Sequence, residues 1–218
     1  MDAMIWASFR MWQRICYIPP RNILLVFFAD EEAGSNYGSR WMVKHRPELF
    51  KGYSEAISEV GGFSITITGE NRLYLIEAAQ RGIQWLKLTA KGTAGHGSFV
   101  NKDNAVTKVS DAVSRIGNDE WPQVESRTSS KFFRKIAELT GDKYEASNVK
   151  PLLNHLGNAV KMLGATISNT ANPTMLEAGY KANVIPGSAS AVVDGRFIPG
   201  FEDELNETIR SLIGPDIT

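Results

Sequence analysis

The stretch GIQWLKLTAKG, residues 82–92, sets the fold of the larger part of this chain. Leu86 and Leu88 alternate with Lys87 and Thr89, so that apolar and polar side chains point to opposite sides of the backbone. This period of two predicts a strand with one face in a core and the other in water. The character of the sequence changes where this stretch begins, which predicts a domain boundary between residues 81 and 82.

The sequence that follows predicts an α+β domain over residues 82–218. Asp103 is expected to cap a helix after a glycine-rich loop, and a further helix is expected over 202–213. Strands are expected over 165–180 and 184–198. The order strand, helix, strand, strand, helix is that of a ferredoxin-like split βαβ sandwich whose last strand is missing. The apolar positions expected to face its core are Val106, Val109, Val113, Ile116, Leu205, Ile209, Leu212 and Ile213.

Residues 118–164 are expected to form a helical insert within this domain. Thr128 begins one predicted helix, and Pro151 lies near the first turn of a second, where proline is well tolerated. Each helix has its apolar residues on one side, which predicts packing against a core. These residues are Phe132, Phe133 and Ile136 in the first helix, and Leu152, Leu153, Leu156, Val160 and Leu163 in the second.

The first part of the chain, residues 1–81, predicts part of a catalytic α/β domain. The apolar run at 23–29 does not alternate, which is typical of a strand covered on both faces. Strands and helices alternate along this region, and this order favours a layer with parallel pairing. The expected elements are a helix at 2–16, a strand at 23–29, a helix from near Ser35 to just before Pro47, a strand at 54–60 and a strand at 72–79 after the turn TGEN.

Charge and composition exclude several function classes. Twenty-four basic residues balance twenty-four acidic ones, so no overall field favours nucleic acid or an anionic membrane. No apolar run approaches the roughly 20 residues of a membrane helix. The start of the chain does not read as a signal peptide because Asp2, Arg10 and Arg14 interrupt it, and the single Cys16 fits a reducing compartment. We therefore expect a cytoplasmic protein with neither a nucleic-acid nor a membrane partner.

Three adjacent acids, Asp30, Glu31 and Glu32, follow the expected strand at 23–29. Two carboxylates about 4 Å apart repel by about 4 kcal/mol at an effective dielectric constant of about 20, so packing alone does not explain them. One interpretation is that they complement the dipole of the next helix. Glu59 ends the next expected parallel strand and favours another: two carboxylates at neighbouring strand ends suit a metal ion such as zinc. Glu31 would then be free to act as a general base.

Three other polar residues are candidates for a site. His96 lies in KGTAGHGSF between glycines, which leave its ring free of neighbouring side chains, although a loop histidine without a role is the alternative. Asn183 and Arg196 lie at opposite ends of an expected strand. Arg196 is a natural bidentate partner for a carboxylate, and pairing with nearby Asp194 is the alternative to a substrate.

Four stretches in order, FFADEEAGSNYGSR, AISEVGG, KGTAGHGS and ANVIPGSASAVVDGRF, together resemble the co-catalytic zinc exopeptidase and deacylase family, which includes glutamate carboxypeptidase and aminoacylase. The resemblance implies a catalytic α/β domain with two zinc ions and a lid domain that forms a homodimer. It implies a hydrolase that acts on peptides or N-acyl amino acids and cleaves the amide or peptide bond next to a free carboxylate. By this resemblance Glu31 is the general base, Glu32 and Glu59 each bind one zinc ion, and His96 polarises the scissile carbonyl, often across a dimer interface. Asn183 and Arg196 would hold the substrate and its carboxylate.

The chain departs from the family in its metal ligands. The early H-x-D motif, a bridging aspartate and a late histidine ligand of the family have no counterpart here. Each zinc ion would keep one protein ligand, Glu32 or Glu59, whereas catalytic zinc sites ordinarily have three. We therefore expect an internal section of such an enzyme that is inactive alone. The alternative is a non-catalytic dimerisation or binding module.

Overall fold

The computed structural model describes residues 2–58 and 63–218. The chain divides into two compact units, residues 1–61 and 62–218, and each is described by itself. This division lies upstream of the boundary expected between residues 81 and 82, which stays a prediction.

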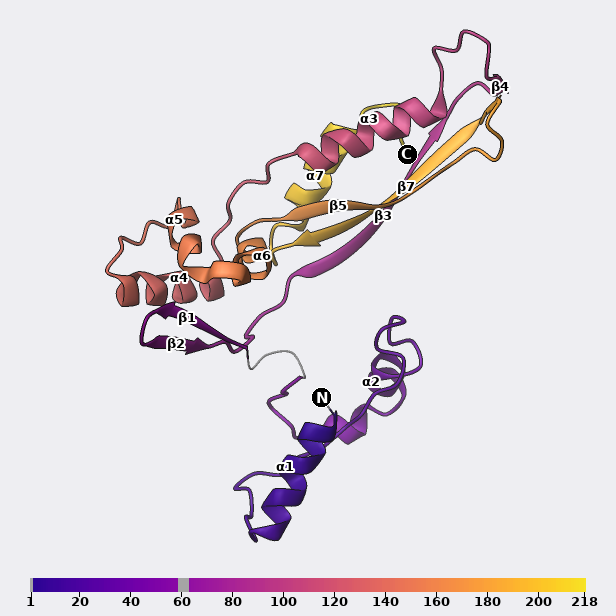
Figure 1. Cartoon of the computed structure of the whole chain (residues 1–218). Coiled ribbons are helices and arrows are strands. Elements are labelled where there is room, and N and C mark those ends of the chain that lie inside the picture. Colours follow the sequence, from indigo (N-terminus) through magenta and orange to yellow (C-terminus); the bar gives the residue numbers. More distant parts are fainter. Residues whose placement is uncertain (1, 59–62) are drawn as a thin grey trace. The chain divides into compact units, whose positions relative to one another are not determined.

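A three-stranded antiparallel sheet forms the centre of the second unit (Figure 1). Its order is β3 (Gly82–Lys91), β7 (Ser188–Phe197) and β5 (Thr170–Ala178). Since β7 lies between β3 and β5 and runs against both, the sheet has the split βαβ arrangement that the sequence predicts. The α+β fold expected for this part of the chain is therefore confirmed.

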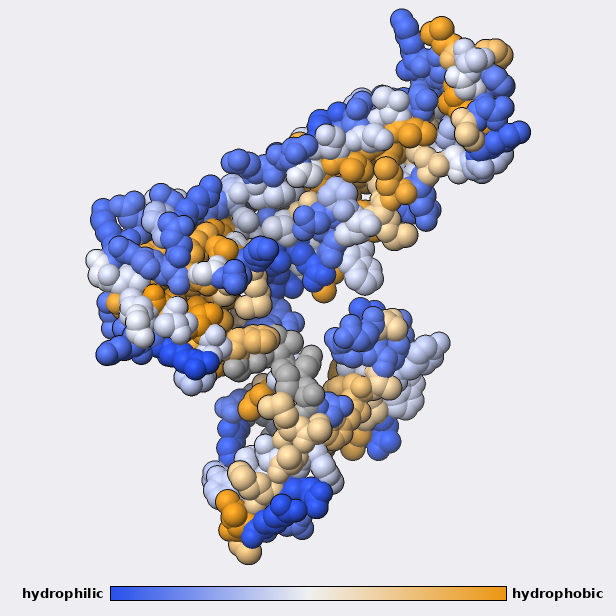
Figure 2. All heavy atoms as spheres, viewed as in Figure 1, coloured by the Kyte–Doolittle hydropathy of each residue, from blue (hydrophilic) through white to orange (hydrophobic). Residues whose placement is uncertain are grey.

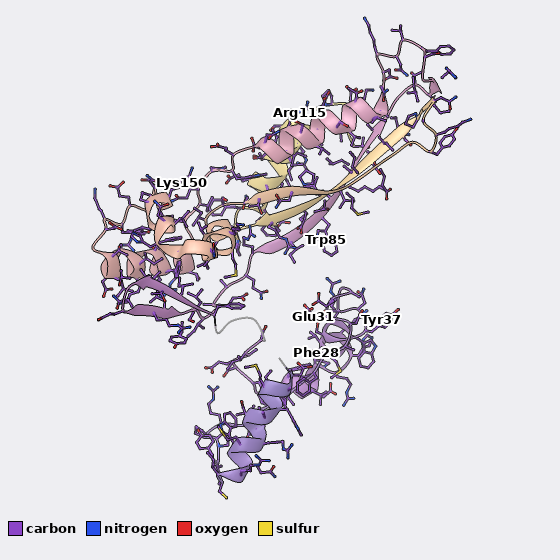
Figure 3. The ribbon with its side chains drawn as sticks, in the orientation of Figure 1. Phe28, Glu31, Tyr37, Trp85, Arg115 and Lys150 are labelled. Atoms are coloured by element: carbon purple, nitrogen blue, oxygen red, sulfur yellow. The ribbon has the colours of Figure 1, made fainter. Side chains whose placement is uncertain are left out.

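Two helices, α3 (Ala105–Asn118) and α7 (Glu202–Ile213), pack on one face of this sheet. The period of two in β3 and of about 3.6 in the helices brings their apolar side chains into one core. The opposite face is open: Ile83 and Trp85 are 56% and 72% exposed, and Figure 3 shows Trp85 on the side of β3 away from α3. The buried residues of the core include Leu88, Ala90, Val109, Ala112, Ile116, Val193, Leu205 and Ile209.

The outer edge of β3 is partly paired. Ile217 forms an antiparallel bridge with Ala90 and is buried in the core, and the Thr218 and Thr89 backbones exchange two hydrogen bonds of 2.7 and 3.0 Å. Ile217 and Thr218 therefore occupy part of the position that the last strand of the predicted sandwich would fill, at the outer edge of β3. Among the described residues, no strand pairs with this edge from Gly82 to Leu88.

The insert builds a second, smaller core. Its helix α4 (Arg127–Thr140) begins one residue before the predicted Thr128 because the Ser126 hydroxyl accepts from the Ser129 backbone amide in a capping box. The predicted second helix is broken at Gly157, whose φ of 52° is not helical. Its pieces are α5 (Lys150–Leu153), η2 (Asn154–Ala159), α6 (Val160–Leu163) and η3 (Gly164–Ile167).

A hairpin from upstream of β3 completes this second core. Strands β1 (Ser64–Thr68) and β2 (Asn71–Tyr74) pair antiparallel around the turn TGEN, and Ile67 packs with Phe133 and Leu156. The strand expected at 72–79 is thus shorter, and its expected place in a parallel layer is wrong. Strand β2 pairs instead with β1, its neighbour in sequence, because closing a tight turn costs little chain entropy.

The first unit consists of helices and irregular chain. Helix α1 (Asp2–Arg14) confirms the helix expected at 2–16, and α2 (Ser39–His45) is followed by the short η1 (Pro47–Phe50). No residue from 2 to 58 belongs to a strand, so the expectation at 23–29 is wrong, as is the described part of the one at 54–60. A covered parallel strand needs hydrogen-bond partners on its neighbours, and the described residues of this unit offer none.

Helices long and apolar enough to cross a membrane are absent from the part of the chain that the structure describes.

Candidate functional site

Two connections that meet beyond one end of the central sheet carry the first two candidate residues: His96 lies between β3 and α3, and Asn183 lies between β5 and β7. The short strand β4 (Gly95–His96) pairs with β6 (Val184–Ile185), placing His96 opposite Val184. The Gly97 amide donates to the Asn183 carbonyl at 2.9 Å. The structure thus brings His96 and Asn183, which are far apart in sequence, into one small cluster.

The glycine-rich sequence around His96 has a local physical reason. A Cβ on Gly97 would lie 3.3 Å from the carbonyl carbon and oxygen of Asn183, so a larger residue would press against the backbone of the facing strand. Glycine therefore lets the two chains approach closely on the Asn183 side of the loop.

The base of this loop is tied to α3. Asp103 accepts from the Thr93 hydroxyl at 2.7 Å and forms an ion pair with Lys108 at 2.5 Å. These bonds, first that from Lys108 and then that from Thr93, lower the pKa of Asp103. The helix cap expected at Asp103 is instead supplied by Asn104, whose side chain accepts from the Val106 amide.

The His96 ring is exposed and held by its own loop. Its Nδ1 lies 2.8 Å from the Ser98 hydroxyl and 3.3 Å from the Ser98 backbone nitrogen. The Phe99 ring centre lies 5.8 Å from that of the imidazole. Phe99 and Val100 are themselves 68% and 93% exposed, and Figure 2 shows apolar residues among polar ones at this end of the unit. The histidine therefore stands at an accessible tip with an apolar rim.

Arg196 lies at the other end of β7 and already has a partner. Its Nε and Nη2 donate to the two Asp194 oxygens at 2.6 and 2.8 Å, the pairing held open as an alternative in the sequence. The Arg196 hydrogen bonds lower the pKa of the Asp194 carboxyl, and the nearby Arg81 and Trp85 side chains lower it further. The structure therefore does not bring Arg196 together with His96 within one chain.

Arg81 is a candidate that the sequence reasoning missed. Its Nη1 donates to the Thr170 hydroxyl at 3.0 Å, and among the described residues no carboxylate forms a direct ion pair with it, although Asp194 is near enough to interact electrostatically. Burial, and then the nearby Arg196 guanidinium, lower the pKa of Arg81. Its position two residues before Ile83, on the open face of the sheet by the period of two, was the available signal.

The acidic cluster lies in the first unit, in the loop before α2. Asp30 has a positive φ of 64°, and its carboxylate accepts from the Tyr37 amide at 2.9 Å, so it shapes this turn. Glu31 and Glu32 are exposed side chains, and Figure 3 shows Glu31 in the loop with Tyr37. Glu59 lies outside the described residues.

The described residues bring no complete set of metal donors together. Among them, no three histidine, cysteine, aspartate or glutamate side chains are grouped closely enough to hold a metal ion. Zinc sites ordinarily take three or four protein ligands. The described donors therefore do not fit a zinc site by themselves.

The open sheet, the two covering helices and the histidine-bearing tip define an α+β lid domain of the split βαβ class. Residues 78–216 match the M20 peptidase dimerisation domain family. This match spans more than half of the chain, so the chain belongs to that family.

Curated relatives extend over most of this chain. A probable carboxypeptidase S-like protein of Dictyostelium discoideum is 26% identical over 88% of this chain and 38% of its own length. Aminoacylase-1 of Sus scrofa is 28% identical over 85% of this chain and 38% of its own length. An uncharacterized metallohydrolase of Methanocaldococcus jannaschii is 27% identical over 89% of this chain and 39% of its own length. The chain spans about two fifths of the length of these relatives, and its family is one of metal-dependent hydrolases.

Proposed function

We propose that this chain is the lid-bearing section of a hydrolase that cleaves amide or peptide bonds next to a free carboxylate. The observation that carries the proposal is the tip of a peptidase dimerisation domain on which His96 and Asn183 are held together. The names of the relatives, an aminoacylase and a carboxypeptidase-like protein, support peptides or N-acyl amino acids as substrates.

Each candidate residue has a proposed role. Glu31 is the general base, and the exposed His96 ring donates a hydrogen bond to the oxygen that becomes negative as the carbonyl is attacked. Asn183 and Arg196 hold the substrate and its carboxylate. Glu32 and Glu59 are proposed as ligands of two zinc ions, for which the described residues make no complete site.

The length of β7 makes dimerisation part of this proposal. At about 3.4 Å per residue, Arg196 stands roughly 27 Å along the strand from Ser188, and the His96 tip lies beyond that end. A small substrate cannot contact both residues of one copy. We propose that His96 of one copy donates its hydrogen bond to a substrate whose carboxylate is bound by Arg196 of a second copy.

The carboxylate requirement can be measured by binding alone. We expect N-acetyl amino acids to shift the resonances of Trp85 and of neighbouring residues in an NMR titration of the chain. The matched control ligand is the same compound with its carboxylate blocked as an amide, which should bind at least tenfold more weakly because it lacks the charge that the guanidinium recognises. Arg196→Gln should remove this preference. Equal binding of both ligands would contradict the proposed substrate class.

A second candidate function is a homodimerising module without catalysis. The unpaired stretch of the β3 edge, from Gly82 to Leu88, favours it, because such an edge offers backbone groups to another chain.

We propose the cytoplasm as the location of this protein, because its single Cys16 is exposed and fits a reducing compartment.

A further inference from the structure

The loop that follows His96 folds back on the histidine itself. The Phe99 amide donates to the His96 carbonyl at 3.0 Å, which closes a turn over His96, Gly97, Ser98 and Phe99. This turn places the Ser98 backbone and hydroxyl against the imidazole ring. Both contacts are made to the same atom, Nδ1.

The chemistry of these two contacts favours one position for the proton of the imidazole. A backbone amide only donates, so the Ser98 N–H, 3.3 Å from Nδ1, favours an unprotonated Nδ1 with a free lone pair. The Ser98 hydroxyl at 2.8 Å can then donate to the same nitrogen. A neutral imidazole with an accepting Nδ1 carries its hydrogen on Nε2.

Nε2 is the ring atom left for a ligand. Among the described residues, it has no hydrogen-bond partner, and the ring is exposed. On the other side of the turn, the bond from Gly97 to the Asn183 carbonyl anchors the loop to the facing strand. The loop therefore holds the imidazole with its Nε2 atom accessible at the tip.

We propose that Ser98 is a positioning residue that holds neutral His96 in the Nε2–H tautomer. Its catalytic meaning rests on the proposed function, since an Nε2–H group is the donor that a developing oxyanion needs. The tautomer itself is a property of this chain and is measurable without substrate or metal.

The test is a long-range ¹H–¹⁵N correlation spectrum of the histidine rings in the ¹⁵N-labelled chain. It is recorded at about pH 8.5, where imidazole side chains are commonly neutral. His96→Gln assigns the His96 signals among those of the three histidines. We expect an unprotonated Nδ1 and a protonated Nε2 at His96.

The variants separate Ser98 from general effects on the fold. Ser98→Ala removes the hydroxyl donor and should raise the ratio of Nδ1–H to Nε2–H tautomer about three- to tenfold, the range that one hydrogen bond supports. Ser98→Thr keeps the hydroxyl and should restore the original ratio. Ser211→Ala, which removes a hydroxyl bonded within α7, is the matched control and should leave His96 unchanged.

Two results would overturn the proposal: a His96 ring protonated on Nδ1 in the unaltered chain, or His96 nitrogen shifts that do not respond to Ser98→Ala. Neither result bears on carboxylate binding. Conversely, a failed carboxylate titration would leave the tautomer measurement standing, so failure of the positioning role is distinguishable from failure of the proposed function.

Discussion

Asp194 stands between two cationic side chains on the open face of the sheet. It accepts both hydrogen bonds of Arg196 and also interacts electrostatically with Arg81. The Arg196 bonds lower the pKa of Asp194, while Asp194 raises the pKa of Arg196. The local sequence Asp-Gly-Arg suggested this pair, because residues two apart in a strand share a face. The electrostatic interaction of Arg81 with Asp194 depends on how the strands pair, so the sequence did not predict it.

Acid should remove the contribution of this pair to stability. The Asp194 pKa is lower in the folded chain than its usual 3.8, so its stabilisation is complete above that value and is lost as the pH falls through the folded pKa. The pair is partly exposed, so we expect Asp194→Asn to cost about 1 kcal/mol or less near neutral pH. Urea unfolding at several pH values measures this difference.

The control for this prediction is Arg81→Gln in the Asp194→Asn background. Without the shared carboxylate, Arg81 and Arg196 repel, so removing Arg81 should restore part of the loss. A stability difference between the chain and Asp194→Asn that stays constant down to about pH 2 would contradict the linkage argument.

At the scale of elements, the free edge of β3 matters most. The Thr89 amide and carbonyl point to the outer edge, where they bond Thr218. By the period of two, the backbone groups of Lys87 and Trp85 point to the same edge, where they have no strand partner among the described residues. The sequence predicted the strand from its alternation, yet only the sheet order shows which edge is open.

Blocking that edge should weaken a homodimer formed by strand pairing. Lys87→Pro removes an outward amide while leaving the bonds to β7, a position at which edge strands tolerate proline. We expect sedimentation equilibrium to show at least a tenfold weaker dimer for Lys87→Pro. Lys87→Ala keeps the amide and should dimerise like the unaltered chain. A strictly monomeric unaltered chain, or equal dimerisation of both variants, would contradict pairing through β3.

For the whole molecule, the number of metal donors sets what the chain can do alone. Glu32 is exposed, and the described residues form no group of three donors. One carboxylate competes poorly with water for a divalent cation, because catalytic zinc sites ordinarily combine three protein ligands. We therefore propose that this chain by itself holds no zinc tightly.

The chain purified with excess zinc and then desalted should retain well under one zinc ion per molecule by elemental analysis. It should not hydrolyse N-acetyl amino acids or dipeptides. The control is Glu31→Gln: hydrolysis that persists in this variant comes from a contaminant, whereas hydrolysis that disappears would refute the prediction. Two zinc ions retained per chain would refute it equally.

The amino-acid sequence determined the elements whose residues recur with a regular period: β3, the helices α1, α3, α4 and α7, and the split βαβ order of the second unit. Such periods are visible because side chains two, three or four residues apart share a face. Tertiary structure alone decided that β2 pairs with β1 over the insert, that 23–29 is not a strand, and that Arg81 lies near Arg196. These outcomes depend on which distant backbone groups find partners, and a local pattern does not record that.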